Sequence, residues 1–382
     1  MLNLFFSFLS EQNQLVGNKT ALRQKLSTGY SINYFCAMLE DKNRTELSDL
    51  GEFGLIDKIA KSVKLTQPSS FKGIGDDAAV IGTEKKKTLV STDLLMEGIH
   101  FDLSYVPLKH LGYKAVVVNV SDIYAMNGKP TQITISLGLS SRFSLEAIDE
   151  FYTGVLLACE KYNVDLIGGD TSSSAAGLAI SITAIGEAKE ENIVYRNGAK
   201  DTDLICVSGD LGGAYIGLQL LEREKQIFKE NAAIQPDLSG HDYVLERQLK
   251  PEARADIIDI LEMEKVKPTA MLDISDGLSS DIMHICTQSE VGCRIYAEKI
   301  PIDHTTQIAA EELNIDSTIA ALNGGEDYEL LFTVDISDHD KIKENPAIRI
   351  IGHITEKADG YNLVSADQAI PLQAQGWNHL GN

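Results

Sequence analysis

Carboxylate side chains recur beside Gly, Ser or Thr at the edges of short apolar segments of this chain. The six segments that share this design are residues 75–79, 90–93, 120–122, 167–171, 273–277 and 324–328. Strand ends and helix starts are the places where open α/β sheets gather ligands. Carboxylates that converge there repel one another unless cations lie between them, and Mg²⁺ suits such a site because it takes oxygen ligands and accompanies substrate phosphates. The pattern predicts a nucleotide site with several Mg²⁺ ions.

Each acid alone also has an ordinary structural explanation. Asp and Gly form turns, and Ser275 or Asp276 is suited to cap the helix expected to begin near Leu278. Asp122 differs, because it lies in the middle of an apolar helical stretch, where an unpaired buried acid is costly. A metal ion or a base must neutralise it there. The set as a whole therefore favours metal ligation.

Four other side chains are candidates for substrate contacts, each with a structural alternative. Arg196 offers a bidentate fork to phosphate, although alone it is better explained as a surface residue of a linker. His100 suits an organic substrate or a core position equally, and Glu326, after two glycines, suits a substrate amine or a turn. Trp377 is a stacking candidate, although packing of the C-terminus is the commoner role. Standard motifs such as GxxxxGK[ST] are absent from the sequence.

The elements that must position these residues alternate between strands and helices. The first half has expected strands at 78–81, 88–92, 131–139, 164–167 and 178–185, and expected helices at 53–63, 107–126 and 145–162. The second half has expected strands at 203–207, 269–272, 293–296, 328–334 and 348–354, and expected helices at 214–224, 242–248, 252–262 and 278–288, with a loop at 225–239. This alternation predicts α/β or α+β layers in both halves.

Length, charge and cysteine content limit the number of domains, the classes of partner and the compartment of the protein. The 382 residues suggest two domains, and the net charge of -22 argues against nucleic acid or an anionic membrane as a partner. No apolar run approaches the 18 residues that a transmembrane helix needs. The five cysteines form no CxxC pair, which indicates reduced residues of a cytoplasmic protein.

The N-terminal segment differs in composition from the rest of the chain. Residues 1–37 are polar with one apolar burst, and a sequence that resembles a normal start begins at Met38. We predict that residues 1–37 are a disordered extension or a misassigned start. Residues 38–198 are then expected to form an N-terminal domain that binds the nucleotide and Mg²⁺, and residues 199–382 a C-terminal α/β domain.

Together the motifs resemble the thiamine-monophosphate kinase family, in the superfamily that includes aminoimidazole ribonucleotide synthetase. The matching segments are residues 51–53, 73–79, 91–93, 100–101, 119–126, 168–171, 196–199, 273–277 and 324–330. They occur in the order of the family and, with Trp377, cover the chain from about residue 51 onward. No single motif is decisive, but the ordered set is specific.

The resemblance implies transfer of the γ-phosphoryl group of ATP to thiamine monophosphate, with several Mg²⁺ ions per site. The implied metal ligands are Asp77, Ser91, Thr92, Asp93, Asp122, Asp170, Asp273 and Asp276, of which Asp122 and Asp93 are expected to matter most for catalysis. The implied ATP contacts are Gly169, Asp170, Arg196 and Ser275, and the implied thiamine contacts are His100, Glu326 and Trp377. The implied fold has two domains, with N-terminal sheets that pair into a barrel in a homodimer.

Several alternatives stay open at this point. Selenophosphate synthetase and the hydrogenase-maturation relative depend on reactive cysteines, for which the sequence offers no matching context, and a purine-synthesis synthetase lacks features such as residues 324–329. A non-catalytic metal or nucleotide sensor would use the same acids without turnover.

Overall fold

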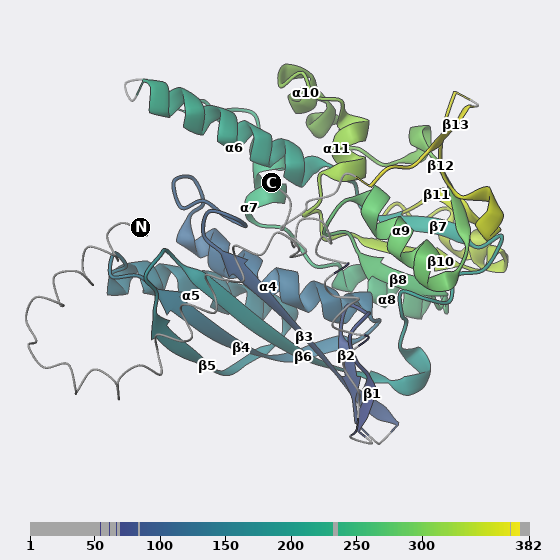
Figure 1. The fold of residues 1–382 in the computed structure, drawn as a ribbon, viewed down its shortest axis with the longest axis horizontal. Helices are drawn as coiled ribbons and strands as arrows, with labels where there is room; N and C mark the ends of the chain where they lie inside the picture. Colours follow the sequence, from purple (N-terminus) through teal and green to yellow (C-terminus); the bar gives the residue numbers. More distant parts are fainter. Residues whose placement is uncertain are drawn as a thin grey trace, which may run out of the picture. The chain divides into compact units, whose positions relative to one another are not determined.

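A computed structural model describes residues 69–82, 85–231, 236–366 and 368–374, together with the single positions Gly54, Lys61 and Thr66. The predictions for residues 1–37, for a start at Met38, for the helix at 53–63 and for Trp377 lie outside the described residues. The described chain contains two sheets with their own helices (Figure 1), as expected for two α/β layers. No helix in this part of the chain is long and apolar enough to cross a membrane.

The N-terminal sheet has six strands in the order β1-β2-β3-β6-β4-β5. Their bounds are β1 (Ser70–Lys72), β2 (Ala79–Ile81), β3 (Lys86–Met96), β6 (Ala179–Lys189), β4 (Lys129–Leu139) and β5 (Asp165–Ser173). β4 and β5 run parallel and the other neighbours are antiparallel. Residues of β6 alternate between buried and half-buried, because one face of the sheet is covered by helices.

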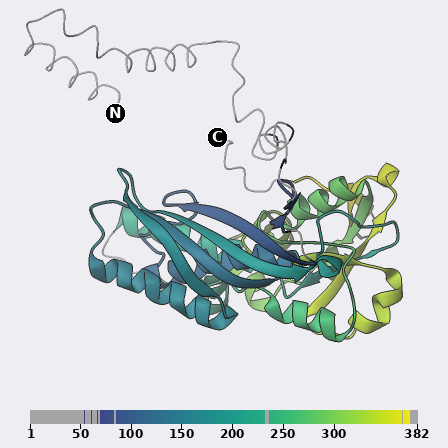
Figure 2. The same cartoon turned by 90° about the horizontal axis from the view of Figure 1, so that it is seen from below.

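Helices α4 (Leu108–Ala125) and α5 (Leu145–Tyr162) form that covering layer, and Figure 2 shows helices beneath the strands. The two helices cross closely because glycines face the contact. A Cβ atom on Gly112 would lie 2.0 Å from the Phe151 carbonyl oxygen, and one on Gly154 would lie 1.8 Å from that of Lys109. Ser144 caps α5 by accepting from the Ala147 N–H. α4 is buried along most of its length, so it passes through the protein rather than over its surface.

The C-terminal sheet has seven strands in the order β13-β12-β9-β11-β7-β10-β8. Their bounds are β13 (Gln368–Pro371), β12 (Tyr361–Ser365), β9 (Gly292–Tyr296), β11 (Ile348–Thr355), β7 (Leu204–Ser208), β10 (Leu330–Val334) and β8 (Ala270–Asp273). The central strand β7 is apolar on both sides. Ile205 and Val207 pack in one core with residues of α9 (Leu278–Ser289), whereas Cys206 packs in another with residues of α8 (Ala255–Met263).

A third helical group packs beside this sheet. It contains α6 (Gly213–Glu230), α7 (Asp242–Leu249), α10 (His304–Glu312) and α11 (Ser317–Asn323). α6 continues to Glu230, so the expectation of a loop from residue 225 was wrong over its first six residues. No Gly or Pro interrupts the helix there, and it ends at Asn231, which has an extended backbone.

Two strand-end predictions were also wrong. Ser91, Thr92 and Asp93 lie inside β3, which pairs with β6 as far as Met96, and residues 168–171 lie inside β5, which continues to Ser173. The apolar run ends in both cases before the backbone pairing does, because Ser, Thr and Asp also occupy strand positions when one side of the sheet is open. β12 and β13 were missed for a related reason, since both are only partly buried or exposed.

Candidate active site

Three carboxylates from distant parts of the sequence meet where the two sheet layers join. Asp77 precedes β2, Asp122 lies near the end of α4, and Asp273 is the last residue of β8. One oxygen of each lies within 4.8 Å of the others. We call these three residues the acid cluster. It confirms that the 76–77, 120–122 and 273–277 segments converge, as the sequence pattern indicated.

Two hydroxyl groups and a fourth carboxylate surround the acid cluster. Ser91 donates a hydrogen bond to Asp122 Oδ2, and Ser121 donates one to Asp273 Oδ2. The backbone N–H of Asp93 donates to Asn119 Oδ1 at 3.0 Å, which fixes β3 against α4. Asp93 Oδ2 is buried and has no hydrogen-bond partner among the described residues. A buried carboxylate oxygen without a partner is unusual, because its desolvation is not compensated.

Burial and neighbouring charges raise the pKa values of Asp93, Asp122 and Asp273. Burial, followed by the charge of Asp77, raises the pKa of Asp93 to about 6 and that of Asp273 to about 7. Burial and then the neighbouring charge of Asp93 raise the pKa of Asp122 well above its ordinary value. Both causes disfavour the charged form, so the group of acids holds fewer charges than its residue count suggests unless a cation is present.

The donor set fits Mg²⁺. Asp77, Asp122 and Asp273 supply hard carboxylate oxygens that converge, and Asp93 supplies an oxygen that no other described residue contacts by a hydrogen bond. Mg²⁺ prefers such ligands and keeps several waters, so a partly open carboxylate site suits it better than a fully enclosed one. In the part of the chain that the structure describes, neither cysteine nor histidine, the ligands that select zinc, belongs to the convergent group.

A cation of the protein already touches this site. Arg196 forms two hydrogen bonds with Asp77, Nε to Oδ2 at 3.0 Å and Nη2 to Oδ1 at 2.7 Å. Its backbone N–H also donates to Asp76 Oδ1 at 2.7 Å. The structure thus places the predicted phosphate-binding arginine directly on a predicted metal ligand. Its fork geometry is the one that also binds phosphate oxygens.

The loop between β8 and α9 holds Ser275 and Asp276 beside Asp273. Asp281, one turn into α9, accepts from the backbone N–H groups of Asp276 at 3.3 Å and Gly277 at 3.1 Å. Burial and then the charge of Asp276 raise the pKa of Asp281 well above its ordinary value. The sequence analysis missed Asp281. The sequence feature that could have identified Asp281 is an acidic residue in the first turn of a helix, directly after a loop that already contains acids.

Glu326 and His100 lie in tight backbone segments. Glu326 has a left-handed backbone, with φ of 58°, and its N–H donates to the Ser275 carbonyl at 2.8 Å. Its carboxylate contacts Lys114 and Gln248. His100 follows β3, and its Nδ1 accepts from the Met96 N–H at 3.0 Å. The sequence analysis did not consider Lys114 or Gln248.

Thr92 and Asp170 are not brought to the acid cluster within this chain. Thr92 alternates with Ser91 and Asp93 along β3, so it lies on the opposite face of the sheet, where Thr183 donates to it. The pairing register runs from Asp93 through Ile182 and Ile135 to Gly169. Three strand spacings place Gly169 about 14 Å from Asp93.

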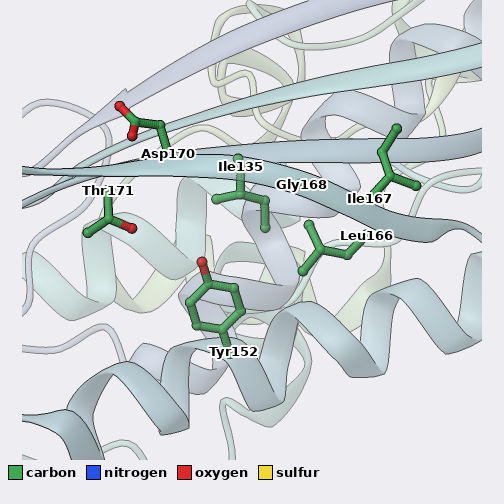
Figure 3. Close-up of a pocket in the computed structure, with 8 residues that line it drawn as sticks. Ile135, Tyr152, Leu166, Ile167, Gly168, Asp170 and Thr171 are labelled. Atoms are coloured by element: carbon green, nitrogen blue, oxygen red, sulfur yellow. The ribbon is translucent and has the colours of Figure 1, made fainter.

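A pocket of about 500 Å³ lies at this far strand, beneath β5. Figure 3 shows Tyr152 rising from α5 toward the underside of β5, where Leu166, Ile135 and Thr171 also point, whereas Asp170 points to the other side. Gly169 has no room for a side chain, since a Cβ atom there would lie 1.8 Å from the Ile135 carbonyl oxygen. Sequence analysis missed Tyr152, because an aromatic residue on an amphipathic helix is ordinarily a core residue.

The chain is similar to known proteins over most of its length. Family models of AIR synthase related protein match residues 75–188 as its N-terminal domain and residues 203–363 as its C-terminal domain. A thiamine-monophosphate kinase of Aquifex aeolicus is 38% identical over 338 residues, which cover 87% of this chain and 99% of that relative. The chain belongs to the thiamine-monophosphate kinase family.

Two further relatives of the family agree with this assignment. A thiamine-monophosphate kinase of Bacillus subtilis is 33% identical, with 87% of this chain and all of that relative covered. A solved structure, AaThiL complexed with AMPPCP and TMP, is 34% identical and has a TM-score of 0.75, with 88% of this chain and 100% of that chain covered. The fold is therefore the mixed α/β fold with two sheet domains found in the family.

Proposed function

We propose that this protein transfers the γ-phosphoryl group of ATP to thiamine monophosphate and so makes thiamine diphosphate. The observation that carries the proposal is the acid cluster of Asp77, Asp122 and Asp273, with the unpartnered Asp93 oxygen beside it. Support also comes from the thiamine-monophosphate kinases to which the chain is similar over nearly its full length.

The arrangement suits transfer between two phosphates. The acceptor is a phosphate oxygen that is largely ionised at neutral pH, so the reaction requires no general base. Phosphoryl transfer depends mainly on positioning and on neutralisation of charge. Mg²⁺ bound by Asp93, Asp122 and their neighbours would neutralise and align both phosphates. Ser91 and Ser121 orient the acids by donating hydrogen bonds to them.

The parts of each substrate are assigned as follows. Arg196 and Ser275 would contact the ATP phosphates, and the pocket with Tyr152 beside Gly169 would receive the adenine ring, which stacks well on tyrosine. Glu326 and His100, with Trp377 outside the described residues, would contact the thiamine part. Asp276 would bind a further Mg²⁺.

A homodimer would complete the site. Asp170 and Gly169 lie about 14 Å from Asp93 in one chain, too far to hold the same metal ion. Pairing of the N-terminal sheets of two copies, as in the shared barrel expected above, would bring Asp170 of one copy toward the acids of the other. Mixed dimers of Asp122→Asn and Asp170→Asn, each inactive alone, would then regain activity. Absence of any recovery in verified mixed dimers would contradict this arrangement.

The test of the reaction itself is direct. Purified protein is incubated with ATP, Mg²⁺ and thiamine monophosphate, and the products are separated after oxidation to fluorescent thiochromes. We expect thiamine diphosphate that depends on both ATP and Mg²⁺. A protein that binds ATP and thiamine monophosphate but forms no diphosphate would be a sensor rather than a kinase. We also propose, from the cysteine pattern, that the reaction takes place in the cytoplasm.

A further inference from the structure

Lys114 is a buried cation that the proposed reaction does not yet use. It lies in α4, is only 5% exposed, and is surrounded on that helix by apolar residues. A lysine is almost never buried without a partner, because its ammonium group loses its hydration. Its partners therefore indicate what the residue does.

Among the described residues, the partners of Lys114 are Glu326 and Gln248, which also contact each other. Lys114 Nζ lies 3.1 Å from Glu326 Oε1 and donates to the Gln248 carbonyl oxygen at 3.1 Å. The side chain of Gln248 donates through Nε2 to Glu326 Oε2 at 2.9 Å. Each oxygen of the carboxylate is thus held by a different donor. Each oxygen still has a second lone pair, and the side chain is 28% exposed, so the carboxylate can accept one more donor from a bound molecule.

The backbone of Glu326 is fixed as tightly as its side chain. Its left-handed φ of 58° is a conformation that a non-glycine residue adopts only when its surroundings enforce it. Gly325 before it leaves no room for a side chain, since a Cβ atom there would lie 2.4 Å from the Ser275 carbonyl oxygen. Both the backbone and the side chain of Glu326 are therefore held in place before any ligand binds.

Helix α4 also sets how far this carboxylate lies from the metal site. Lys114 and Asp122 are eight residues apart on the same helix, which corresponds to about 12 Å along its axis. Ser121, seven residues after Lys114 and therefore on the same side of the helix, donates to Asp273 of the acid cluster. One rigid helix thus spaces a hydrogen-bond acceptor from the phosphate-binding end of the site.

We propose that Lys114 is a positioning residue that determines substrate specificity, because it holds the Glu326 carboxylate where it accepts a hydrogen bond from the exocyclic amine of the substrate's pyrimidine ring. The inference rests on the proposed function. A substrate must then carry a phosphate at one end and a hydrogen-bond donor at the other. A site that expects a donor rejects an analogue that offers an acceptor, because two acceptors are left facing each other.

The test compares two substrates in three proteins. The substrates are thiamine monophosphate and the analogue in which a carbonyl oxygen replaces the pyrimidine amine. The proteins are wild type, Lys114→Met, and Lys109→Met as a matched control, since Lys109 is exposed on the same helix. For Lys114→Met we expect kcat/KM with thiamine monophosphate to fall about tenfold or more, mainly through KM, while the KM for ATP changes less than about twofold.

The ratio of kcat/KM for the two substrates tests the proposal most directly. In Lys114→Met the preference for the amine over the carbonyl analogue should collapse, and Lys114→Arg, which keeps the charge, should restore part of it. If Lys114→Met weakens the use of both substrates and of ATP by the same factor, as measured by kcat/KM, the residue is merely structural and the proposal is overturned. Equilibrium binding of each compound without ATP gives the same comparison if no variant turns over. A wild-type protein that binds both compounds equally would contradict the role of Lys114, whereas one that discriminates but makes no diphosphate would contradict only the proposed reaction.

Discussion

Arg196 and Asp77 are joined by two parallel hydrogen bonds of 3.0 and 2.7 Å. The pair links a predicted ATP-binding residue to a predicted metal ligand, so the arginine and a divalent cation compete for the same carboxylate. Phosphate oxygens of ATP offer the guanidinium an equivalent bidentate partner. Binding of ATP would therefore free Asp77 for the metal, which couples the two ligands.

Replacement of Arg196 by Met tests this coupling. Without the guanidinium, Asp77 is free to ligate, so Mn²⁺ should bind more tightly in the absence of nucleotide, as measured by electron paramagnetic resonance. The KM for ATP should rise about tenfold, because a bidentate charged contact is lost. Arg196→Lys keeps the charge but not the fork, so it should restore little of the ATP affinity. Equal Mn²⁺ affinity in wild type and Arg196→Met would exclude the competition.

Asp122→Asn should remove activity and leave the fold intact. Asp122 lies among several acids and its burial already disfavours the charge, so the amide relieves repulsion in the metal-free protein. We expect kcat to fall by about 10²–10³-fold, the usual cost of one lost electrostatic stabiliser, with a melting temperature without metal at or above that of wild type. Asp149→Asn, at an exposed position on α5, serves as the control. Near-normal turnover of Asp122→Asn would show that the metal assignment is wrong.

The acids also predict how stability depends on pH. The pKa values of Asp93 and Asp273 are about 6 and about 7 in the folded protein, above their ordinary value of 3.8. The folded state therefore binds protons that the unfolded state has released, and this contribution to stability is lost as the pH rises from about 4 to 7. Without metal, the melting temperature should fall over this range. Saturating Mg²⁺ should flatten the profile, because it replaces the protons, and Asp122→Asn should make the metal-free profile shallower.

The sequence predicted correctly that the acids of the acid cluster meet. It did not predict that Thr92 lies on the opposite face of the sheet, or that Asp170 lies on a strand distant from β3. Asp122 was identified because an acid inside an apolar helix needs a partner, and the same argument applied to Lys114 would have found it eight residues earlier. Asp170 was identified by its motif, but its distance from Asp93 depends on the strand order β3-β6-β4-β5, which local pattern does not encode. Thr92 faces away from the acid cluster because β3 continues past the end of the apolar run, so that side chains at successive positions still alternate between the two faces of the sheet.

Glu252 should hold the two halves of the described chain together. It accepts hydrogen bonds from Tyr113 at 2.7 Å and Tyr162 at 2.5 Å, and it pairs with Lys161 and Lys250. Burial alone would raise the pKa of Glu252, but hydrogen bonds from both lysines and both tyrosines lower it to about 2. Its stabilisation is therefore present above the ordinary glutamate pKa of 4.5 and is lost as the pH falls toward 2.

Glu252→Gln should lower the free energy of unfolding by about 1–3 kcal/mol at neutral pH, since the buried Tyr113 and Tyr162 hydroxyl groups lose a charged acceptor. Urea denaturation measures the change, with Glu262→Gln on the exposed side of α8 as the control. The difference between wild type and Glu252→Gln should shrink as the pH is lowered below about 4. A difference that stays constant with pH would indicate that packing, rather than the charge, is responsible.

Tyr152→Ala tests the pocket beneath β5. If the adenine ring stacks there, loss of the aromatic face should cost about 1–3 kcal/mol of ATP binding, the usual value for one base on one ring. The KM for ATP should rise accordingly, while the KM for thiamine monophosphate stays the same. Tyr152→Phe keeps the stacking face and should bind ATP almost normally, and Leu157→Ala, at a half-exposed position on α5 outside the pocket lining, controls for helix stability. Unchanged ATP affinity in Tyr152→Ala would place the adenine elsewhere, and an ATP analogue with a photoreactive base would then locate it.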